Sequence, residues 1–329
     1  MNSRERFEAF FRGEGYMDRL PVFEWAGWWD KTVAAWEAQG MPKGTDVTEY
    51  WKMDRDWHIW LPIRNHDIPR EKSFGSGIIE TAEDYENIKK YLYTDVAFDD
   101  LHRAMQDYVQ NKSDRPCWIT MEGFFWFPRD LLGIENHLYA FYDDPELILQ
   151  INRDLCEFHK KCLEIVYSYT TPLIANFAED MSYNNGPMCS REMYDQFILP
   201  FYKEIVPILK EHNATVMIDT DGNVEPLIPW FLDAGIEGVF PLERMAGVDV
   251  NRVRAQYPDF FMLGGFDKTV LHKGKEAIHA EFERLRPAIQ SGRYLPTMDH
   301  QTPPDASLEN YAYYRQLLEE YCTKYGARK

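Results

Sequence analysis

Acidic residues stand at the ends of short apolar segments throughout this 329-residue chain. The most informative pair is Asp219 and Asp221, which follows the apolar run ATVMI and precedes Gly222. Residues two positions apart on a strand point to the same side, so we expect both carboxylates to face one pocket. Two such carboxylates can share a divalent cation or divide into an acid and a base; a purely structural network is the alternative.

His300 ends the last apolar segment, directly after Asp299. A lone histidine is more often a hydrogen-bonded structural residue. Beside the predicted Asp219 pocket, however, a role as metal ligand or acid–base group is as well supported as the structural role. Glu243, in the segment FPLER, is a third inward candidate. The predicted metal ligands are Asp219, Asp221, Glu243 and His300.

Other segment ends carry further ionisable groups. Glu179 and Asp180 are adjacent, so at most one can point inward, and the other is expected to tie the strand to the turn NNGP. Lys268 could bind a substrate carboxylate or phenolate, or merely neutralise Asp267. A single carboxylate at a strand end usually caps a helix or pairs with arginine. So many carboxylates at one face repel one another, which implies a metal, a bound cation or a raised pKa among them. The predicted catalytic or positioning residues are Glu179, Asp180, Asp299 and Lys268.

Aromatic residues crowd the N-terminal third, in VFEWAGWWD, YWKMDRDWHIW and EGFFWFP. These rings could line a pocket, and they could equally be core filler or an oligomer interface. We expect the substrate to be bound by Glu24, Trp25, Trp28, Glu122, Trp126 and Tyr183.

The elements that position these residues are most regular from residue 172 onward. Short apolar segments there alternate with amphipathic helices, which is typical of successive strand–helix units. We predict strands at 172–180, 214–222, 238–244, 260–268 and 294–304. The predicted helices run from a cap at Ser190 to about 211, over 224–235 with Gly235 as the C-cap, near 249–256, over 272–289, and from a cap at Ser307 to about 324.

The upstream pattern is less regular. Strands are expected at 20–27, at 117–124 and at either 58–63 or 75–81, with helices near 82–110 and 145–170. Eight strands in all predict an α/β fold of the (β/α)8 barrel type, with residues 1–329 in a single domain. In such a barrel the carboxyl ends of all strands converge on one pocket, so the ionisable residues above should gather at one face.

The bulk composition excludes several classes of function. A net charge of -18 and a pI near 4.9 disfavour nucleic acid and anionic membranes as partners. The N-terminus has no apolar run fit for a signal peptide, and no stretch is long enough for a membrane span, so we expect a soluble cytoplasmic protein. Five cysteines without a CxxC pair indicate neither a disulfide framework nor a thiolate zinc site.

These residues resemble the uroporphyrinogen decarboxylase superfamily over nearly the whole chain. The resemblance is carried by NSRERFEAFFRGEGYMDRLPV, GPMCSREMYDQFILPFYKEI, DTDGNVEPLIPWFLDAGIEGVFPLE, LGGFDKTVL and GRYLPTMDHQTPPDASLENY. It implies an α/β barrel, and it suggests a dimer. It also implies one of two activities, that of the haem-pathway decarboxylase or that of the zinc-dependent, corrinoid-linked methyltransferases.

Particular residues separate these two activities. The decarboxylases resemble one another in an arginine-bearing segment after the proline of the first strand, whereas this chain reads PVFEWAGWWD, with Glu24 in that region. The methylcobamide:coenzyme M type carries His-x-Cys-Gly and a later Cys before Pro-Pro as zinc ligands. Here Asp219-Thr220-Asp221-Gly222 and His300 stand at those places. Such an oxygen-rich site still suits Zn²⁺ or another divalent ion, but it argues against a thiol substrate.

The favoured hypothesis is a metal-dependent methyltransferase that exchanges a methyl group between a small substrate, such as an aryl methyl ether or a methylamine, and a corrinoid protein. The alternative is a decarboxylase or other lyase acting on a small carboxylic acid or porphyrinogen-like substrate, with Asp219 or Asp221 as the proton donor. A catalytically inactive barrel used for binding is the third hypothesis. The implied cofactors are a divalent metal, zinc first, and the partner's corrinoid; a homodimer is also expected.

Overall fold

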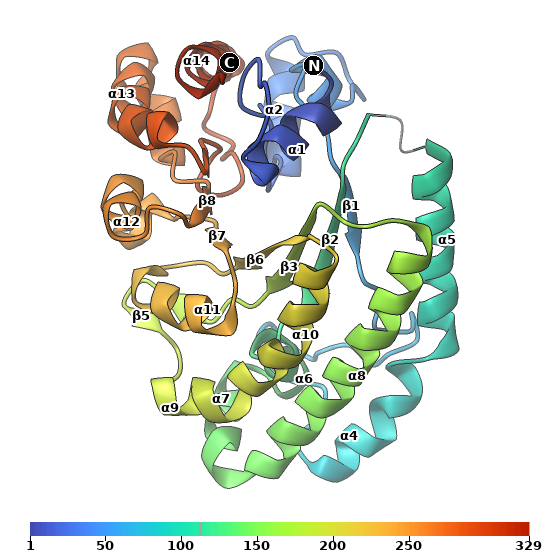
Figure 1. The fold of residues 1–329 in the computed structure, drawn as a ribbon. Coiled ribbons are helices and arrows are strands. Elements are labelled where there is room, and N and C mark those ends of the chain that lie inside the picture. Colours follow the sequence, from blue (N-terminus) through green and yellow to red (C-terminus); the bar gives the residue numbers. More distant parts are fainter. Residues whose placement is uncertain (112–113, 329) are drawn as a thin grey trace.

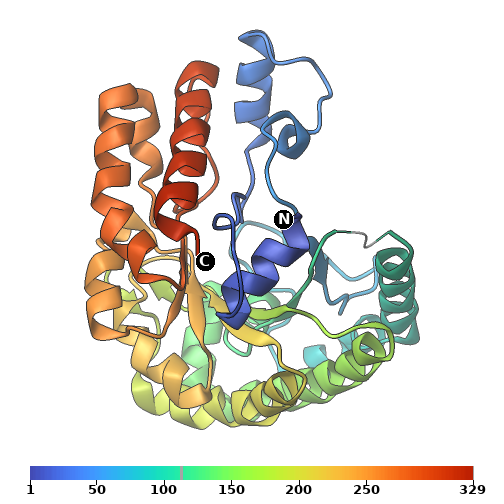
Figure 2. The same ribbon diagram turned by 45° about the horizontal axis from the view of Figure 1, so that its top comes forward.

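Seven parallel strands form the central sheet in the computed structural model, which describes residues 1–111 and 114–328. Neighbouring strands pair in chain order and in parallel register, so that Thr120 lies opposite Asn176 and Ala178 opposite Asp219. Figures 1 and 2 show the helices on the outside of this curved sheet, as in an α/β barrel. The strands are β1 (Trp57–Trp60), β2 (Cys117–Glu122), β3 (Ile174–Ala178), β6 (Thr215–Asp219), β7 (Gly238–Phe240), β8 (Phe261–Leu263) and β9 (Tyr294–Leu295).

The segment of residues 20–28 lies between β1 and β9, at the eighth position of the barrel. On the β1 side, the Asp54 N–H donates to the Val22 carbonyl oxygen (2.7 Å). On the β9 side, the Trp25 indole N–H donates to the Met298 carbonyl oxygen (3.0 Å). The segment therefore closes the barrel partly through side chains, without a continuous backbone ladder.

One expected strand is therefore wrong, and an open choice between two others is decided. Residues 20–27 do not form a strand, because side chains take the place of ladder hydrogen bonds there. Of the two candidates for the second strand, 58–63 is the right one, since β1 covers its first part, whereas 75–81 forms no strand. A separate hairpin of β4 (Ser182–Tyr183) and β5 (Gly186–Pro187) follows β3.

Helices alternate with the strands, and Figure 1 shows α5, α8 and α10 running along the outside of the sheet. Both termini lie on the same side of the molecule, where Met17 and Arg328 exchange backbone hydrogen bonds. The helices are α1 (Ser3–Arg12), α2 (Asp30–Ala38), α3 (Val47–Tyr50), α4 (Ala82–Ile88), α5 (Asp95–Asn111), α6 (Trp126–Leu132), α7 (Ile134–Asp143), α8 (Pro145–Tyr169), α9 (Arg191–Phe197), α10 (Leu199–Glu211), α11 (Ile228–Ala234), α12 (Val250–Gln256), α13 (Lys275–Ser291) and α14 (Leu308–Gly326).

The helix ends follow local sequence signals. The Ser190 side chain accepts from the Met193 N–H at the start of α9, and Gly235 ends α11 in the left-handed conformation (φ 87°), both as expected. The single helix expected from Ser190 to about 211 is instead two helices that meet at Ile198. Pro200 explains the break, because it has no N–H to continue the hydrogen bonding of α9 into α10.

Strand residues supply much of the core. All five residues of β3 are buried, as are Cys117 to Met121 of β2, which fits a parallel sheet covered by helices on its outer face. Side chains of alternate residues, such as Trp118, Thr120 and Asn176, face the barrel interior instead. Within the described ranges, no helix is long and apolar enough to cross a membrane.

Candidate active site

The loops that follow β3, β6 and β7 enclose an acidic hollow of about 340 Å³ at the carboxyl ends of the strands. Asp180, Asp221 and Glu243 line it together with Tyr183. Gly222 has a φ of 83°, and a Cβ at this position would lie 2.6 Å from the Tyr183 backbone, so glycine is needed for the loops to approach. The structure thus brings three of the predicted carboxylates to one mouth, with Tyr183 beside them.

His300 reaches the same mouth from the segment after β9. Its Nε2 lies 3.7 Å from Asp221 Oδ2, and its Nδ1 accepts a hydrogen bond from the Gln301 N–H (2.8 Å). The Trp25 ring packs edge-on against the imidazole, with the ring centroids 5.8 Å apart. Burial and the Lys268 ammonium lower the pKa of His300. Because Nδ1 accepts from the Gln301 N–H, the neutral form of the ring would carry its hydrogen on Nε2, facing Asp221.

Lys268 stands between two acidic groups at this mouth. Its Nζ lies 3.7 Å from Glu243 Oε1 and 3.5 Å from Asp299 Oδ1. Asp299 is fully buried and accepts from the backbone N–H groups of Arg244 (3.1 Å) and Lys268 (3.3 Å), and burial raises its pKa to about 6. Asp299 therefore holds two loops together, while the Lys268 ammonium is the group that reaches the mouth.

Asp219 lies in a second space, a cavity of about 210 Å³ inside the barrel, where Trp118 and Phe240 are part of the wall. Burial, followed by repulsion from Asp180 and Asp221, raises the pKa of Asp219 well above its usual range. Strand β6 ends at Asp219, so strand alternation does not fix the direction of Asp221. The two aspartates line different hollows, in contrast to the single pocket expected from their spacing.

Glu179 is committed to the fold. Its carboxylate accepts from the backbone N–H groups of Phe124 (2.8 Å), Phe125 (2.8 Å) and Trp126 (2.9 Å), and from the Tyr202 hydroxyl. It therefore accepts from the N–H groups at the start of α6 that have no partner within the helix. Neither of its oxygens is left free for catalysis. The expected tie exists, but it leads to the loop after β2 and not to the turn NNGP.

Two further predicted carboxylates lie away from both hollows. Glu24 accepts from the Tyr314 hydroxyl (2.7 Å) and the Met298 N–H (3.0 Å), and burial raises its pKa to about 7. Glu122 lies 3.8 Å from the Arg64 guanidinium, and burial raises its pKa to about 7 also. Neither lines the mouth or the interior cavity, so both are corrected as substrate-binding residues.

Only one of the three tryptophans predicted to bind the substrate lines the interior cavity. Trp25 lines the interior cavity. Trp28 turns outward, and its indole N–H donates to the Tyr311 hydroxyl (2.8 Å). Trp126 stacks against the Arg129 guanidinium (4.8 Å to the ring centroid) beside a separate surface hollow. Trp28 and Trp126 are therefore not placed in the wall around the interior cavity.

Five cavity residues were not predicted as a group: His58, Trp60, Trp118, Thr120 and Asn176. Burial lowers the pKa of His58, against the opposing effect of nearby Asp56. The available signal was the alternation in WHIW and CWITME, where every second residue faces the barrel axis. Trp60 ends β1 but carries no charge, and the other four lie within the strands, so a search for strand-end charges misses them.

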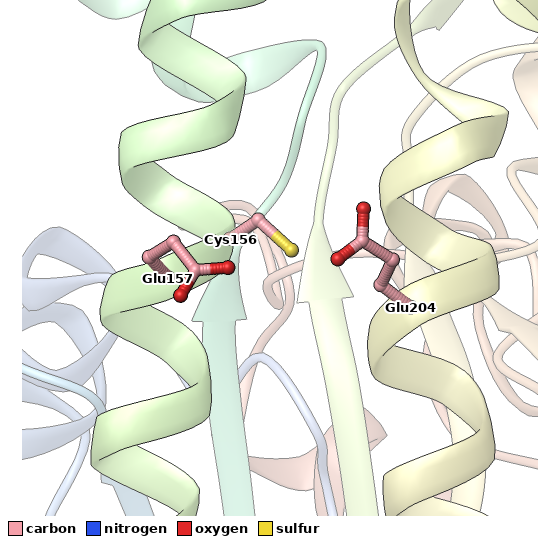
Figure 3. A group of neighbouring side chains, drawn as sticks. All are labelled: Cys156, Glu157 and Glu204. Carbon is pink, nitrogen blue, oxygen red and sulfur yellow. The ribbon is translucent and has the colours of Figure 1, made fainter.

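Within residues 1–111 and 114–328, one group of three metal-ligating atoms lies within 4.8 Å of one another, and its members are Cys156, Glu157 and Glu204 (Figure 3). They come from α8 and α10, outside the sheet. The Lys160 ammonium already bonds Glu157 (2.6 Å) and Glu204 (2.7 Å), and burial raises the pKa of the Cys156 thiol to about 12. To bind a metal, the two glutamates would have to give up their shared contact with Lys160, and the thiol would have to lose its proton.

The predicted ligands at the mouth fit a metal in part. Two ligands of one tetrahedral zinc lie about 3.4 Å apart, close to the 3.7 Å between His300 Nε2 and Asp221 Oδ2. A third ligand is not in place, because Glu243 Oε2 accepts from the Gly222 N–H (2.8 Å). Binding through Nε2 would also move the ring hydrogen to Nδ1 and break its contact with the Gln301 N–H.

Comparisons with known proteins agree with this architecture. A family model described as uroporphyrinogen decarboxylase (URO-D) matches residues 128–321, more than half of the sequence. The chain therefore belongs to the uroporphyrinogen decarboxylase family. No curated protein matches it in sequence.

Two solved structures extend over almost the whole chain. One, named as a methyltransferase from Methanosarcina mazei, has a TM-score of 0.62 and 15% identity, and the match covers 98% of this chain and 99% of that one. The other, described as a candidate vitamin-B12 independent methionine synthase from Listeria monocytogenes, has a TM-score of 0.45 and 11% identity, covering 93% and 98%. The first likeness confirms the barrel fold.

Proposed function

We propose that this chain is a methyltransferase that moves a methyl group between a small substrate inside the barrel and a corrinoid carried by a partner protein. The observation that carries the proposal is the position of His300 Nε2, 3.7 Å from Asp221 Oδ2, beside an aromatic cavity. The Methanosarcina mazei structure of the same fold, which is named as a methyltransferase, supports the class of reaction.

The charges at the mouth favour a substrate without several carboxylates. Asp180, Asp221 and Glu243 line the hollow. Arg129 also lines the hollow and donates to the Asp180 carbonyl oxygen (2.6 Å), and Lys268 lies beside Glu243, so the three carboxylates outnumber the one arginine of the lining. A porphyrinogen would bring its carboxylates against this negative surface, so decarboxylation of a polycarboxylate is the less supported activity.

We further propose that Asp221 and His300 hold a divalent ion, zinc in the first instance. Glu243, and Asp219 from the interior cavity, would have to move to complete the ligand set. When bound, the ion would act as a Lewis acid that makes the oxygen or nitrogen of the methylated substrate a better leaving group. Glu243 would have to exchange its bond to the Gly222 N–H for this role. Asp180, beside Asp221, would orient the ligands.

The transfer balances as follows for a methylated oxygen or nitrogen. The bond from this atom to the methyl carbon breaks, and the atom keeps both electrons. A corrinoid bound to a partner protein would supply, from cobalt(I), the two electrons that form the new bond to the methyl carbon. The leaving atom then takes a proton, for which the Lys268 ammonium at the mouth is a donor.

The test uses the purified chain, free cob(I)alamin and a panel of aryl methyl ethers and methylamines, with and without added zinc. Formation of methylcobalamin, followed by its absorption spectrum, is the expected result, and His300→Ala should abolish it. No methyl transfer from any compound in the panel, under either condition, contradicts the proposal.

A second candidate is proton transfer in a lyase reaction on a small carboxylic acid, with Asp219 as the donor. It is favoured by the position of Asp219 among Trp118 and Phe240, where water is largely excluded. Release of CO2 from a small acid, with deuterium from solvent in the product and no need of a corrinoid, would distinguish it.

A further inference from the structure

Asn176, in the middle of β3, has a hydrogen-bond pattern that fixes which end of its amide faces the interior cavity. Its Oδ1 accepts from Trp118 Nε1 (2.6 Å) and from Thr120 Oγ1 (2.7 Å). An indole N–H can only donate, so the atom it contacts must be the amide oxygen. The amide nitrogen is the end left for the cavity, and it donates to no acceptor in the described parts of the chain.

His58 extends this network in one direction. Thr120 has a single hydroxyl hydrogen, which it gives to Asn176. At the 2.5 Å contact between His58 Nε2 and Thr120 Oγ1, the histidine must therefore donate. The donations run from His58 to Thr120 to Asn176, and such a chain polarises and orders its members. Asn176, only 1% exposed, is thus held rigidly with two N–H hydrogens unused.

Aromatic rings form much of the remaining wall. Trp25, Trp60, Trp118 and Phe240 line the cavity, and the rings of Trp118 and Phe240 pack edge to face with their centroids 5.6 Å apart. Asp56 and Asp219 also line the cavity, so it combines aromatic walls with a few fixed polar groups, which is typical of a small-molecule site. Flat ring faces favour a planar ligand, and the free donor of Asn176 requires an acceptor on it.

We propose that Asn176 recognises an oxygen atom of the substrate, and that the interior cavity takes a small aromatic compound whose ether, hydroxyl or carbonyl oxygen accepts from Asn176 Nδ2. This inference rests on the proposed function in one respect, namely that the substrate binds in the interior cavity. It narrows the substrate class to oxygen-bearing aromatic compounds. Simple alkylamines have neither the ring nor the acceptor.

The test compares methoxybenzene with ethylbenzene, which has nearly the same shape but a methylene in place of the oxygen. Binding to the full chain is measured by calorimetry or tryptophan fluorescence. The wild type should prefer methoxybenzene by about tenfold, the effect of one buried hydrogen bond. Asn176→Asp keeps an acceptor for Trp118 and Thr120 but removes the donor, so it should abolish the preference. Asn213→Asp, the same change at the exposed end of α10, should retain it.

Equal affinity of the wild type for the two probes, or no binding of either, overturns the inference. So does an Asn176→Asp variant that folds and keeps the preference. If that variant does not fold, the double variant Trp118→Phe/Thr120→Val decides, because it removes both donors that orient the Asn176 amide, lets the amide turn and should weaken the preference severalfold. An oxygen preference without methyl transfer would contradict the proposed function alone, and methyl transfer without the preference would contradict this inference alone.

Discussion

The carboxylates near the strand ends fall into two regions with opposite bonding. Between packed elements, Glu24 and Glu179 accept hydrogen bonds from backbone N–H groups and tyrosine hydroxyls. At the mouth, Asp180, Asp221 and Glu243 face a hollow, and burial together with repulsion from the other two raises the pKa of Asp221 to about 7. Carboxylates near equivalent positions of the barrel therefore have two different effects. Those with donors around them stabilise the fold, whereas those that repel one another at the mouth destabilise it and are available for function.

The number of donors around each carboxylate distinguishes the two regions. Glu179 has three backbone N–H groups and a hydroxyl directed at it, whereas Asp221 has His300 at 3.7 Å. Removing a carboxylate of the first kind should lower the free energy of unfolding. Removing one of the second kind should impair function while leaving stability unchanged or higher, as active-site trade-offs predict.

The largest effect is expected for Glu179→Ala. The substitution leaves buried N–H groups at the start of α6 without an acceptor, and it should lower the free energy of unfolding by about 4 kcal/mol. Urea unfolding followed by circular dichroism measures it. The control is Glu164→Ala, on the exposed face of α8, which should change stability by less than about 0.5 kcal/mol. Equal effects of the two substitutions would remove the distinction between the regions.

The second prediction concerns pH and Glu24. Because burial raises its pKa in the folded protein to about 7 from an ordinary 4.5, the folded state keeps the proton while the unfolded state loses it as the pH rises between these values. Stability should therefore fall over this range by about 3 kcal/mol relative to Glu24→Gln. Urea titrations of both proteins between pH 4 and pH 8 measure the gap. A gap that does not change with pH contradicts the assignment.

The third prediction addresses the mouth. His300→Ala should weaken zinc binding by more than about a hundredfold. Loss of a residue that only orients a ligand typically lowers metal affinity about tenfold to a hundredfold, and loss of the ligand itself should lower it further. Calorimetric zinc titration of the metal-free protein measures it independently of activity. His272→Ala, at a half-exposed histidine, is the control and should bind as the wild type does. Tight zinc binding that survives His300→Ala would place the metal elsewhere.

The smallest effect is expected for Asp180→Asn. The change removes a charge that repels Asp219 and Asp221, and asparagine tolerates the left-handed backbone of this position (φ 41°). The free energy of unfolding should rise by about 1 kcal/mol, measured by thermal and urea unfolding. A fall in stability would mean that Asp180 belongs with the structural carboxylates.

Much of the fold follows from the sequence, because buried parallel strands are nearly continuous apolar runs and helix caps are local signals. Ser190, Gly235 and Ser307 mark helix ends as expected. The structure of residues 20–27 could not be predicted from such local signals. Many of the segment's hydrogen bonds join side chains, such as those of Glu24 and Trp25, to residues far along the chain. Position within the barrel decided its structure more than its apolar pattern did.

The site could be predicted only to the level of the strand ends. The sequence placed Asp180, Asp221, Glu243 and His300 near one face, and the structure brings them there. It could not show that Glu179 is saturated, because the donors come from a loop more than 50 residues earlier. The interior network from His58 to Asn176 was missed for the same reason, since each member is bonded across neighbouring strands.

The contacts between residues 20–28 and the last strand–helix unit also bear on how the protein is made. The Glu24 carboxylate finds its donors on Met298 and Tyr314, some 270 and 290 positions later. During synthesis from the N-terminus, the ring of strands stays open until these residues leave the ribosome, and its aromatic interior remains accessible to water and to chaperones. Closure is thus a late event in biogenesis, and such long-range contacts favour slow folding.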